Sequence, residues 1–270
     1  MLNYSAATAI GGREENQDAL WVNGLGLGQG DWEETAGESE GPLLALVCDG
    51  VGGGLAGKGA SDAARRGVET AWRELREAGL DEQRDKLLRQ LAARAQDSVL
   101  RFYEENGGWG GTTLTMALVE PDGRFTLLNI GDSPAFLVCQ GDATEVGFRQ
   151  NLAGYRKRDD LPVRPMDGYQ LMCCLGISRR GLLRDPLAEA WLAEGQLEEG
   201  DRLLLCSDGL EELPFTQEWN DAFEGKNEDQ LLLDYLAAAL QRGEAAAQLV
   251  CTAEALPGAD NCTAILIERM

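Results

Sequence analysis

Three aspartates lie at the ends of apolar segments of strand length, and glycine or asparagine follows each of them. They are Asp49 in LLALVCDGVGG, Asp208 in RLLLCSDGL and Asp260 in GADNCTAILI. Glycine lets the backbone turn sharply and leaves room for an ion beside the carboxylate. Because hard divalent cations prefer carboxylate and carbonyl oxygens, these segments predict a Mg²⁺ or Mn²⁺ site.

Two further aspartates strengthen this prediction. An Asp-Gly pair alone is most often a turn, but GGREENQD places Asp18 directly before a strand segment and FTLLNIGDSPAF places Asp132 after another. Five carboxylates that converged without compensation would repel one another strongly. Bound cations are the simplest way to compensate such a cluster.

The chain contains no histidine. This absence excludes a Ser-His-Asp triad, an HExxH zinc site and histidine acid-base catalysis. The seven cysteines form no CxxC pair and lie mostly in apolar runs, which is typical of small buried side chains in a reducing compartment. Any chemistry must therefore use carboxylates, thiols, arginine, backbone groups or metal ions.

The bulk composition favours one large domain over residues 1–270, because 44% of the residues are hydrophobic and no part is depleted of them. The net charge of −22 disfavours binding to nucleic acid or to an anionic membrane. The first residues do not resemble a signal peptide, and no segment approaches the roughly 20 apolar residues of a membrane helix. We expect a soluble, cytoplasmic protein, most simply a monomer.

Apolar runs of strand length recur along the chain. They cover residues 19–22, 43–48, 112–119, 125–130, 135–138, 202–206 and 263–267. Helical spacing predicts two long amphipathic helices over residues 60–106, separated near Gly79, and two more over 230–241 and 244–256. These elements predict an α+β fold, a sandwich of antiparallel sheets flanked by helix pairs. The glycine-rich acidic stretch 24–41 is expected to be a long mobile hairpin loop.

Six short motifs resemble, in order and over essentially the whole chain, those of the metal-dependent protein phosphatases (PPM), the type 2C serine/threonine phosphatases. The motifs are Arg13 to Asp18 (RxxNQD), Asp49 to Gly53 (DGVGG), Gly111 to Thr113 (GTT), Gly131 to Ser133 (GDS), Asp208 to Gly209, and Asp260 to Asn261. The resemblance implies the family's sandwich fold and hydrolysis of phosphoserine or phosphothreonine on proteins by a metal-bridging water. It also implies a serine/threonine kinase as counterpart, and the RxxNQD form is typical of bacterial members.

The resemblance also implies two Mn²⁺ or Mg²⁺ ions with distinct ligands. Asp49 would bridge both ions, and the Gly50 carbonyl would bind one of them. Asp208 and Asp260 would bind the other. Asp18 would act largely through bound water.

A weaker third ion would be shared by Asp132 and Asp208, and Arg13 would grip the substrate phosphate through the paired donors of its guanidinium. Within the same motifs, the supporting residues are Asn16, Gly209 and Asn261. Eukaryotic relatives have a histidine after the first Asp-Gly, where this chain has Val51, so water must protonate the leaving alcohol. Pro134 follows GDS in place of the common arginine, a departure from the family pattern at the turn that carries Asp132.

A basic segment stands out near the middle of this acidic chain. Eight bases minus three acids leave +5 on residues 149–184. The bases are Arg149, Arg156, Lys157, Arg158, Arg164, Arg179, Arg180 and Arg184. We place a flap at about residues 147–186. It is either a solvated loop whose charges cluster by chance or a flap that draws anionic substrate toward the protein.

Two alternative functions compete with metal-dependent hydrolysis. Residues 173–179 match CxxGxxR, the loop in which thiol-dependent phosphatases attack with a cysteine, here Cys173, and bind phosphate with an arginine, here Arg179. Met172, however, stands where that family usually has histidine. The second alternative is an inactive PPM-like module used for binding or signalling, although such relatives generally lose metal aspartates.

Overall fold

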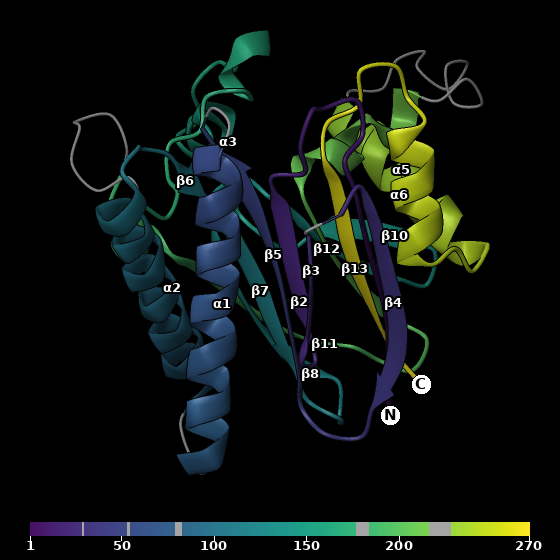
Figure 1. Ribbon diagram of the computed structural model, residues 1–270. Coiled ribbons are helices and arrows are strands. Elements are labelled where there is room, and N and C mark those ends of the chain that lie inside the picture. The colour runs from purple at the N-terminus through teal and green to yellow at the C-terminus, as the bar shows by residue number, and fades with distance from the viewer. Residues whose placement is uncertain (29, 53–54, 79–82, 177–183, 216–227) are drawn as a thin grey trace.

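Two antiparallel sheets pack face to face, and helices cover the outer face of each (Figure 1). The computed structural model describes residues 1–28, 30–52, 55–78, 83–176, 184–215 and 228–270. This arrangement confirms the α+β sandwich that the sequence predicts.

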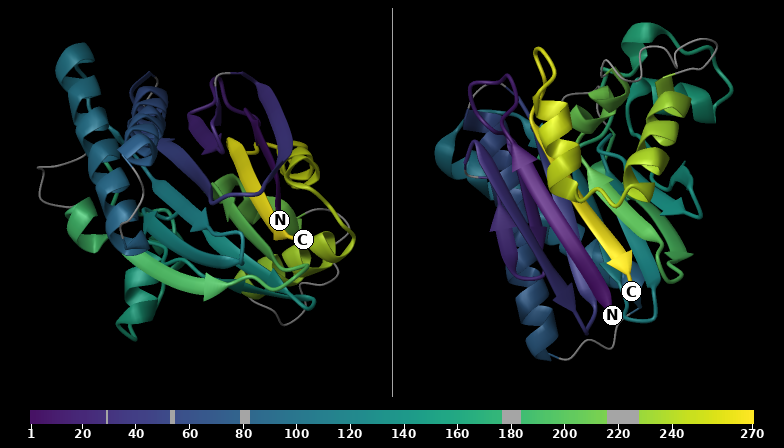
Figure 2. Two further views of the ribbon diagram at one scale, coloured as in Figure 1. Left: turned by 90° about the horizontal axis from the view of Figure 1, so that it is seen from below. Right: turned by 90° about the vertical axis from the view of Figure 1, so that its right-hand side faces the viewer.

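The first sheet joins both ends of the chain. In spatial order its strands are β10 (Asp142–Glu145), β9 (Ala135–Cys139), β12 (Arg202–Cys206), β13 (Cys262–Arg269), β1 (Leu2–Ala9) and β4 (Trp32–Ser39). Leu2 pairs with Arg269 and Ala9 with Cys262, so the two termini lie side by side (Figure 2). Residues that follow β1 and residues that precede β13 therefore meet at one end of the sandwich.

The second sheet contains the strands nearest the long helices. Its order is β11 (Trp191–Gln196), β8 (Arg124–Ile130), β7 (Leu114–Val119), β5 (Leu43–Val51), β2 (Asp18–Val22) and β3 (Leu25–Leu27), and β6 (Gly111–Thr112) pairs with the end of β5. Its central strand segments are buried on both faces, which explains their nearly continuous apolar sequences.

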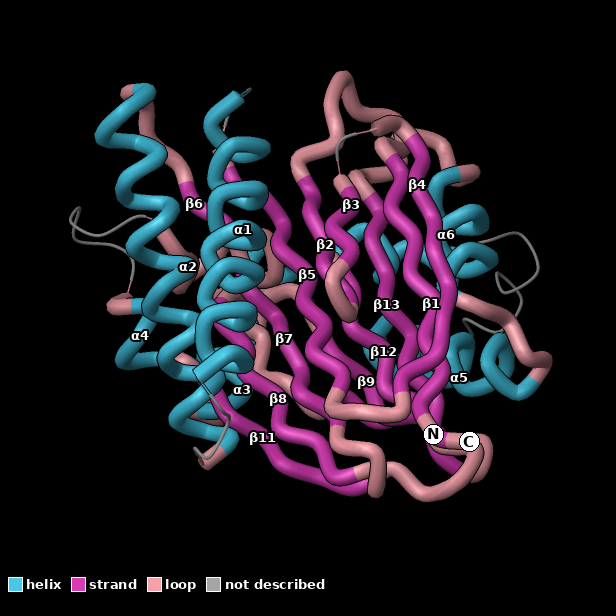
Figure 3. Tube along the Cα trace, turned by 60° about the horizontal axis from the view of Figure 1, so that its bottom comes forward, coloured by secondary structure: helices cyan, strands magenta, loops and turns pink. Residues whose placement is uncertain are grey.

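Three apolar clusters of buried side chains hold the sandwich together. Helices α1 (Leu55–Ala78) and α2 (Arg84–Asn106) cover the second sheet, whereas α5 (Glu228–Gln241) and α6 (Ala246–Glu254) cover the first (Figure 3). The side chains of Leu88, Leu91, Ala95 and Val99 recur at helical spacing and are fully buried. The predicted helix break at Gly79 lies outside the described residues. No helix within the described ranges has the length and apolar content needed to cross a membrane.

The predicted hairpin loop at residues 24–41 is wrong over most of its length, because β3 and β4 form there. Strand β4 has the sequence WEETAGES and pairs along all of β1 as an edge strand. Its residues alternate between exposed and half-buried, so acidic side chains are tolerated and apolar ones are not required. Charged edge strands also resist pairing with other chains. The composition of this stretch is therefore typical of a loop, although its backbone is paired in the first sheet.

Where the structure describes the flap, at residues 147–176 and 184–186, it contains little regular structure. Helix α3 (Leu152–Arg158), the 3₁₀ helix η1 (Pro165–Asp167) and helix α4 (Pro186–Glu189) lie in it or at its end. Its returning segment contacts the outgoing one through a bridge between Asn151 and Leu171 and contacts the second sheet through a bridge between Leu175 and Thr112. The flap is thus tied to the strand end that carries GTT.

Candidate metal centre

Strand pairing brings the first two predicted aspartates together. In the register of β2 and β5, Asp18 lies directly opposite Asp49. Opposed residues in an antiparallel pair have neighbouring side chains, and like charges in such a pair repel. Two carboxylates are therefore held side by side at this end of the second sheet.

The first sheet supplies the next two aspartates at the same end. Asp208 begins the 3₁₀ helix η2 (Asp208–Phe215) just after β12, and Asp260 lies just before β13, its antiparallel neighbour. Asp208 lies close enough to Asp49 for the two carboxyls to influence each other, so aspartates of both sheets come together here. Asp132 follows β8 and is close enough to Asp208 for mutual repulsion. The structure thus gathers all five predicted aspartates.

This crowding raises the pKa values of the carboxyls. Burial, and then repulsion from Asp208 and Asp260, raises the pKa of Asp18 to about 7 even though the hydrogen bond from Ser207 lowers it. Burial and Asp208 likewise raise the pKa of Asp132 to about 7.

The other two carboxyls with resolved shifts move in the same direction. Burial raises the pKa of Asp49 well above its usual range, with Asp18 and Asp208 adding repulsion, and the pKa of Asp208 is also raised by burial and by Asp260. Part of the Asp208 residue nevertheless remains exposed at the surface, so the cluster opens to solvent there. Without added positive charge, protons have to neutralise part of this cluster.

One buried oxygen of the cluster lacks a protein partner. The Oδ2 atom of Asp18 accepts a hydrogen bond from Ser207 Oγ at 2.7 Å, but Oδ1 is buried and meets no donor among the described residues. A buried acceptor without a partner is costly. Oxygen ligands, excess negative charge and an unpaired oxygen all fit a hard divalent cation or its bound water.

Asp260 is turned toward Arg13 at the mouth of the cluster. Its Oδ2 accepts from Arg13 Nη2 at 2.5 Å, and its Oδ1 accepts from the backbone N–H of Asn261 at 2.8 Å. Both oxygens are therefore engaged. In the part of the chain that the structure describes, no three acidic or thiol groups already surround one point closely enough to hold an ion. Cation binding by Asp260 requires Arg13 to give up or share Oδ2.

The supporting asparagines Asn16 and Asn261 hold the loop between β1 and β2 against the turn before β13. Asn16 accepts from the backbone N–H of Asp18 at 3.1 Å and donates to Thr8 at 2.9 Å. Asn261 accepts from the N–H of Gln17 at 2.9 Å and donates to two carbonyls of the same loop. Their amides thus position Asp18 and Asp260.

Glycines are required where segments pass closely. A Cβ on Gly209 would lie 2.1 Å from the carbonyl oxygen of Asn261, and one on Gly50 would lie 2.4 Å from that of Gly57. Such distances exclude any side chain without backbone movement. The Asp-Gly pairs therefore allow the turns to approach each other.

A buried hydroxyl network, which the sequence did not reveal, connects Asp49 to the turn of Asp132. Thr113 Oγ1 accepts from the backbone N–H of Asp49 at 2.9 Å and hydrogen-bonds with Ser133 Oγ at 2.7 Å. Thr112 Oγ1 donates to the Asp49 carbonyl at 3.0 Å. The GTT and GDS motifs signalled these positions but not their contact.

Removal of one hydroxyl tests this network. Thr113→Val keeps the shape but leaves the Asp49 N–H and the Ser133 hydroxyl without their partner, so we expect the free energy of unfolding to fall by about 2 kcal/mol. Urea denaturation measures the change. Thr113→Ser retains the hydroxyl and should stay within about 1 kcal/mol of the wild type. Equal losses in both variants would show that packing of the methyl group, and not the hydroxyl, matters.

Most bases of the flap are paired with acids of the same protein. The pairs are Arg149 with Glu145 and Glu211, Arg156 with Asp167, Lys157 with Asp229, Arg158 with Asp159, and Arg184 with Glu189. Arg158 and Arg184 also lie over the ring of Tyr155. These contacts leave less free positive charge for steering substrate than the sequence count suggests. Arg179 and Arg180 lie outside the described residues.

The thiol of the competing motif is poorly placed for catalysis. Cys173 is fully buried, and burial is the first cause that raises its pKa to about 12. A nucleophilic cysteine requires an accessible thiolate with a lowered pKa. The arginine of that motif, Arg179, is not among the described residues. The geometry of Cys173 therefore favours a structural role.

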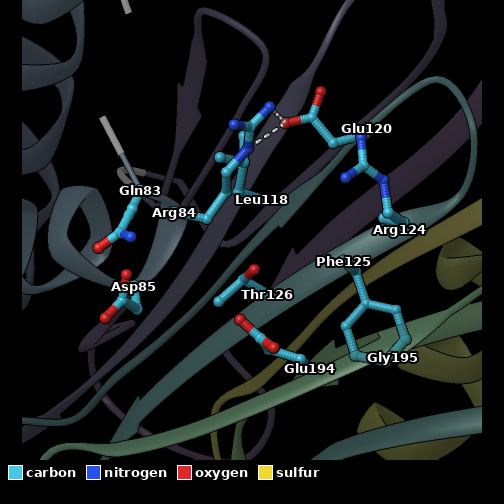
Figure 4. A pocket seen from close by; sticks show the side chains of 10 residues that line it. All are labelled: Gln83, Arg84, Asp85, Leu118, Glu120, Arg124, Phe125, Thr126, Glu194 and Gly195. Carbon is cyan, nitrogen blue, oxygen red and sulfur yellow. Dashed lines mark hydrogen bonds and ion pairs between the residues drawn. The ribbon is translucent and has the colours of Figure 1, made fainter. Parts of the chain in front are cut away.

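A separate cavity of about 450 Å³ contains none of the predicted site residues (Figure 4). It lies between the start of α2, the hairpin of β7 and β8, and β11. The ion pair of Arg84 with Glu120, at 2.5 Å, forms part of its lining. Nothing in its lining resembles the oxygen cluster described above.

Comparison with known proteins agrees with the motifs. The family model described as Protein phosphatase 2C matches residues 26–158. The serine/threonine phosphatase stp of Listeria welshimeri is 25% identical over 241 residues, 84% of each chain. The Mycobacterium tuberculosis serine/threonine phosphatase PstP/Ppp has the same fold, with a TM-score of 0.69, 22% identity and 99% of both chains covered.

A further solved structure contains metal ions. The catalytic domain of the phosphatase PstP, solved in complex with two manganese ions, matches with a TM-score of 0.60 and 21% identity over 99% of both chains. The family model covers just under half of the chain, and the bacterial relatives and the shared fold agree with it. The chain is therefore similar to the protein phosphatase 2C family.

Proposed function

We propose that the chain hydrolyses phosphoserine and phosphothreonine esters on proteins, with two Mn²⁺ or Mg²⁺ ions held by the aspartate cluster. The observation that carries the proposal is the cluster itself, in which carboxylates from both sheets crowd together with a buried oxygen of Asp18 left unpaired. The two manganese ions in the structure of PstP support the number of ions.

The residues of the chain would divide the work at the site. Asp49, at the junction of the two sheets, would bridge the ions, with the Gly50 carbonyl on one ion and Asp208 and Asp260 on the other. Asp18 would orient bound water through its unpaired oxygen. When bound, the ions supply a lowered pKa for bridging water and positive charge that stabilises the phosphoryl oxygens.

Asp132 and Arg13 flank this core. Asp132, beside Asp208, would contribute to a weaker third site. Arg13 is half exposed at the mouth of the cluster, where its guanidinium can donate paired hydrogen bonds to the substrate phosphate. Because Val51 stands where eukaryotic relatives have histidine and the chain has none, solvent water would protonate the leaving serine or threonine oxygen.

Chelation tests the proposal directly. We expect EDTA to abolish hydrolysis of a phosphothreonine peptide and added Mn²⁺ to restore it, because the cluster cannot generate a nucleophile without cations. Cys173→Ala should retain activity within about twofold, since that thiol is buried. Activity that resists EDTA but disappears in Cys173→Ala would establish the thiol mechanism instead. A metal-loaded wild type no faster than Asp208→Asn would identify a binding module.

Arg13→Ala should separate phosphate binding from cation binding. We expect kcat/KM for phosphopeptides to fall about 100-fold through loss of a charged donor to the transition state. The affinity for Mn²⁺, measured by calorimetry, should rise or stay unchanged, because Arg13 competes for Asp260 Oδ2. Arg124→Ala, on a distant exposed hairpin where it pairs with Asp122, is the matched control and should change neither. Weaker Mn²⁺ binding in Arg13→Ala would contradict this role.

We infer that the substrates are phosphoproteins modified by a serine/threonine kinase, and that the chain acts in the cytoplasm as a monomeric, single phosphatase domain. The named relatives support a protein substrate. Phosphopeptide profiling of the wild type against a variant with charge reversal at Arg156, Lys157 and Arg158 would test whether the flap selects among substrates. Unchanged selectivity would assign those bases to internal pairing alone.

A further inference from the structure

Gln150, at the root of the flap, uses every hydrogen-bonding group it has. Its backbone N–H donates to the Gly131 carbonyl at 2.9 Å, and its side-chain oxygen accepts from the Gly131 N–H at 2.8 Å. Its side-chain nitrogen donates to the Glu189 carbonyl at 2.6 Å, and its own carbonyl accepts from Met172 at 2.8 Å. The residue is fully buried. Through its backbone and side chain together, Gln150 thus joins the turn of Asp132, the returning part of the flap and helix α4.

Gly131, which Gln150 holds on both sides, is the residue before Asp132. It has a φ of +105°, and a Cβ there would lie 2.6 Å from the methyl group of Thr113. The turn therefore has little freedom to adopt another backbone conformation. A displacement of Gln150 must move the turn of Asp132 or break two hydrogen bonds.

Arg149 forms the corresponding link to the turn of Asp208. Its Nε donates to Glu145 at the end of β10 at 2.8 Å, and its Nη1 donates to Glu211 at 2.6 Å. Glu211 lies three residues after Asp208 on η2. The Arg149 side chain is only 17% exposed, so water cannot easily replace these ion pairs. Charge-assisted bonds of this kind are stronger and more directional than neutral ones.

We propose that Arg149 and Gln150 are positioning residues that couple the flap to the acidic turns of Asp208 and Asp132. A cation bound by those aspartates then stabilises the observed position of the flap, and a displaced flap weakens cation binding there. The coupling is reciprocal because both events share the same two turns. This inference rests on the proposed metal-dependent function and names the residues that transmit metal occupancy to the flap.

A purely structural role predicts a different result. If Arg149 only stabilised the fold, its loss would lower stability without linking cations to flap motion. The discriminating measurement is hydrogen exchange of the full chain during Mn²⁺ titration, read in peptides covering residues 151–175. Calorimetry of the same titration reports the affinity of each binding step.

In the wild type we expect saturating Mn²⁺ to slow exchange in these peptides at least tenfold. Arg149→Met keeps the length of the side chain but removes both ion pairs. This variant should lose most of that slowing. It should also weaken the lowest-affinity Mn²⁺ step about 10- to 100-fold, the loss that is typical when a residue that holds metal ligands in place is replaced. Arg149→Lys can engage only one acid at a time and should give an intermediate result. Gln150→Met should behave like Arg149→Met if it folds.

Arg158→Met is the matched control. It removes the same charge from the flap, but Arg158 pairs with Asp159 and stacks on Tyr155 without contacting either acidic turn. The inference is overturned if Mn²⁺ does not slow the flap of the wild type, if Arg149→Met is slowed equally, or if Arg158→Met loses as much. No phosphopeptide is needed. If Mn²⁺ slows exchange in the flap but the protein hydrolyses no phosphopeptide, only the proposed function is rejected. If the protein hydrolyses phosphopeptides but Mn²⁺ does not slow exchange in the flap, only this inference is rejected.

Discussion

Replacement of Asp49 by asparagine is expected to abolish phosphatase activity and, at the same time, to stabilise the metal-free protein. Asp49 joins the carboxyls of both sheets, and burial together with its neighbours raises its pKa well above the usual range. The amide cannot bridge two cations, so kcat should fall about 1,000-fold or more. The same amide carries no charge and removes repulsion, so Tm without metal should rise by about 3 to 8 °C.

Asp122→Asn is a matched control for Asp49→Asn. Asp122 also precedes a glycine, but it lies exposed in the hairpin of β7 and β8 and pairs with Arg124. Neither activity nor the Tm of the metal-free protein should change there. Differential scanning calorimetry in EDTA and initial rates with Mn²⁺ provide both measurements. An Asp49→Asn protein that is less stable than the wild type in EDTA would show that its carboxylate is compensated by the protein itself.

The opposite signs expected for these two effects would explain why the aspartates of the cluster stand out in the sequence. Carboxylates at the ends of buried strands cannot arise from packing, because the fold alone would be more stable with amides or small residues there. Local rules such as strand composition and the Asp-Gly turn were therefore enough to place Asp49 and Asp208 at the ends of strands. The long helices were predicted for a related reason, since their apolar spacing is local.

What the sequence could not show depends on contacts between distant segments. Ser207 holds Asp18 across 189 residues, and Thr113 reaches Ser133 from a different strand. The local sequence around a serine or threonine does not show whether its hydroxyl joins a buried hydrogen-bond network or is solvated. Arg149 was counted with the other bases as part of a net charge, although its partners place it beside the acidic turns. The strand β4 was missed because an edge strand needs no apolar sequence.

The stability of the metal-free protein should fall as pH rises from about 4 to about 7, which is the reverse of its behaviour with metal. Burial raises the pKa of both Asp18 and Asp132 from 3.8 to about 7. Between these values the folded state holds protons that the unfolded state has released, so each rise in pH favours unfolding. Together the two groups amount to several kcal/mol, and Tm in EDTA should fall by roughly 10 °C between pH 5 and pH 7.5.

With saturating Mg²⁺ or Mn²⁺ the sign reverses, because the cations bind ionised carboxylates and protons compete with them. Tm should then rise over the same range, and the curves with and without metal should diverge as pH increases. Other carboxyls also titrate, so the decisive comparison is with the Asp18→Asn/Asp132→Asn variant, whose Tm in EDTA should vary much less over this range. A wild type whose metal-free Tm rises from pH 5 to pH 7.5 in parallel with the variant would mean that the five aspartates do not repel one another in solution.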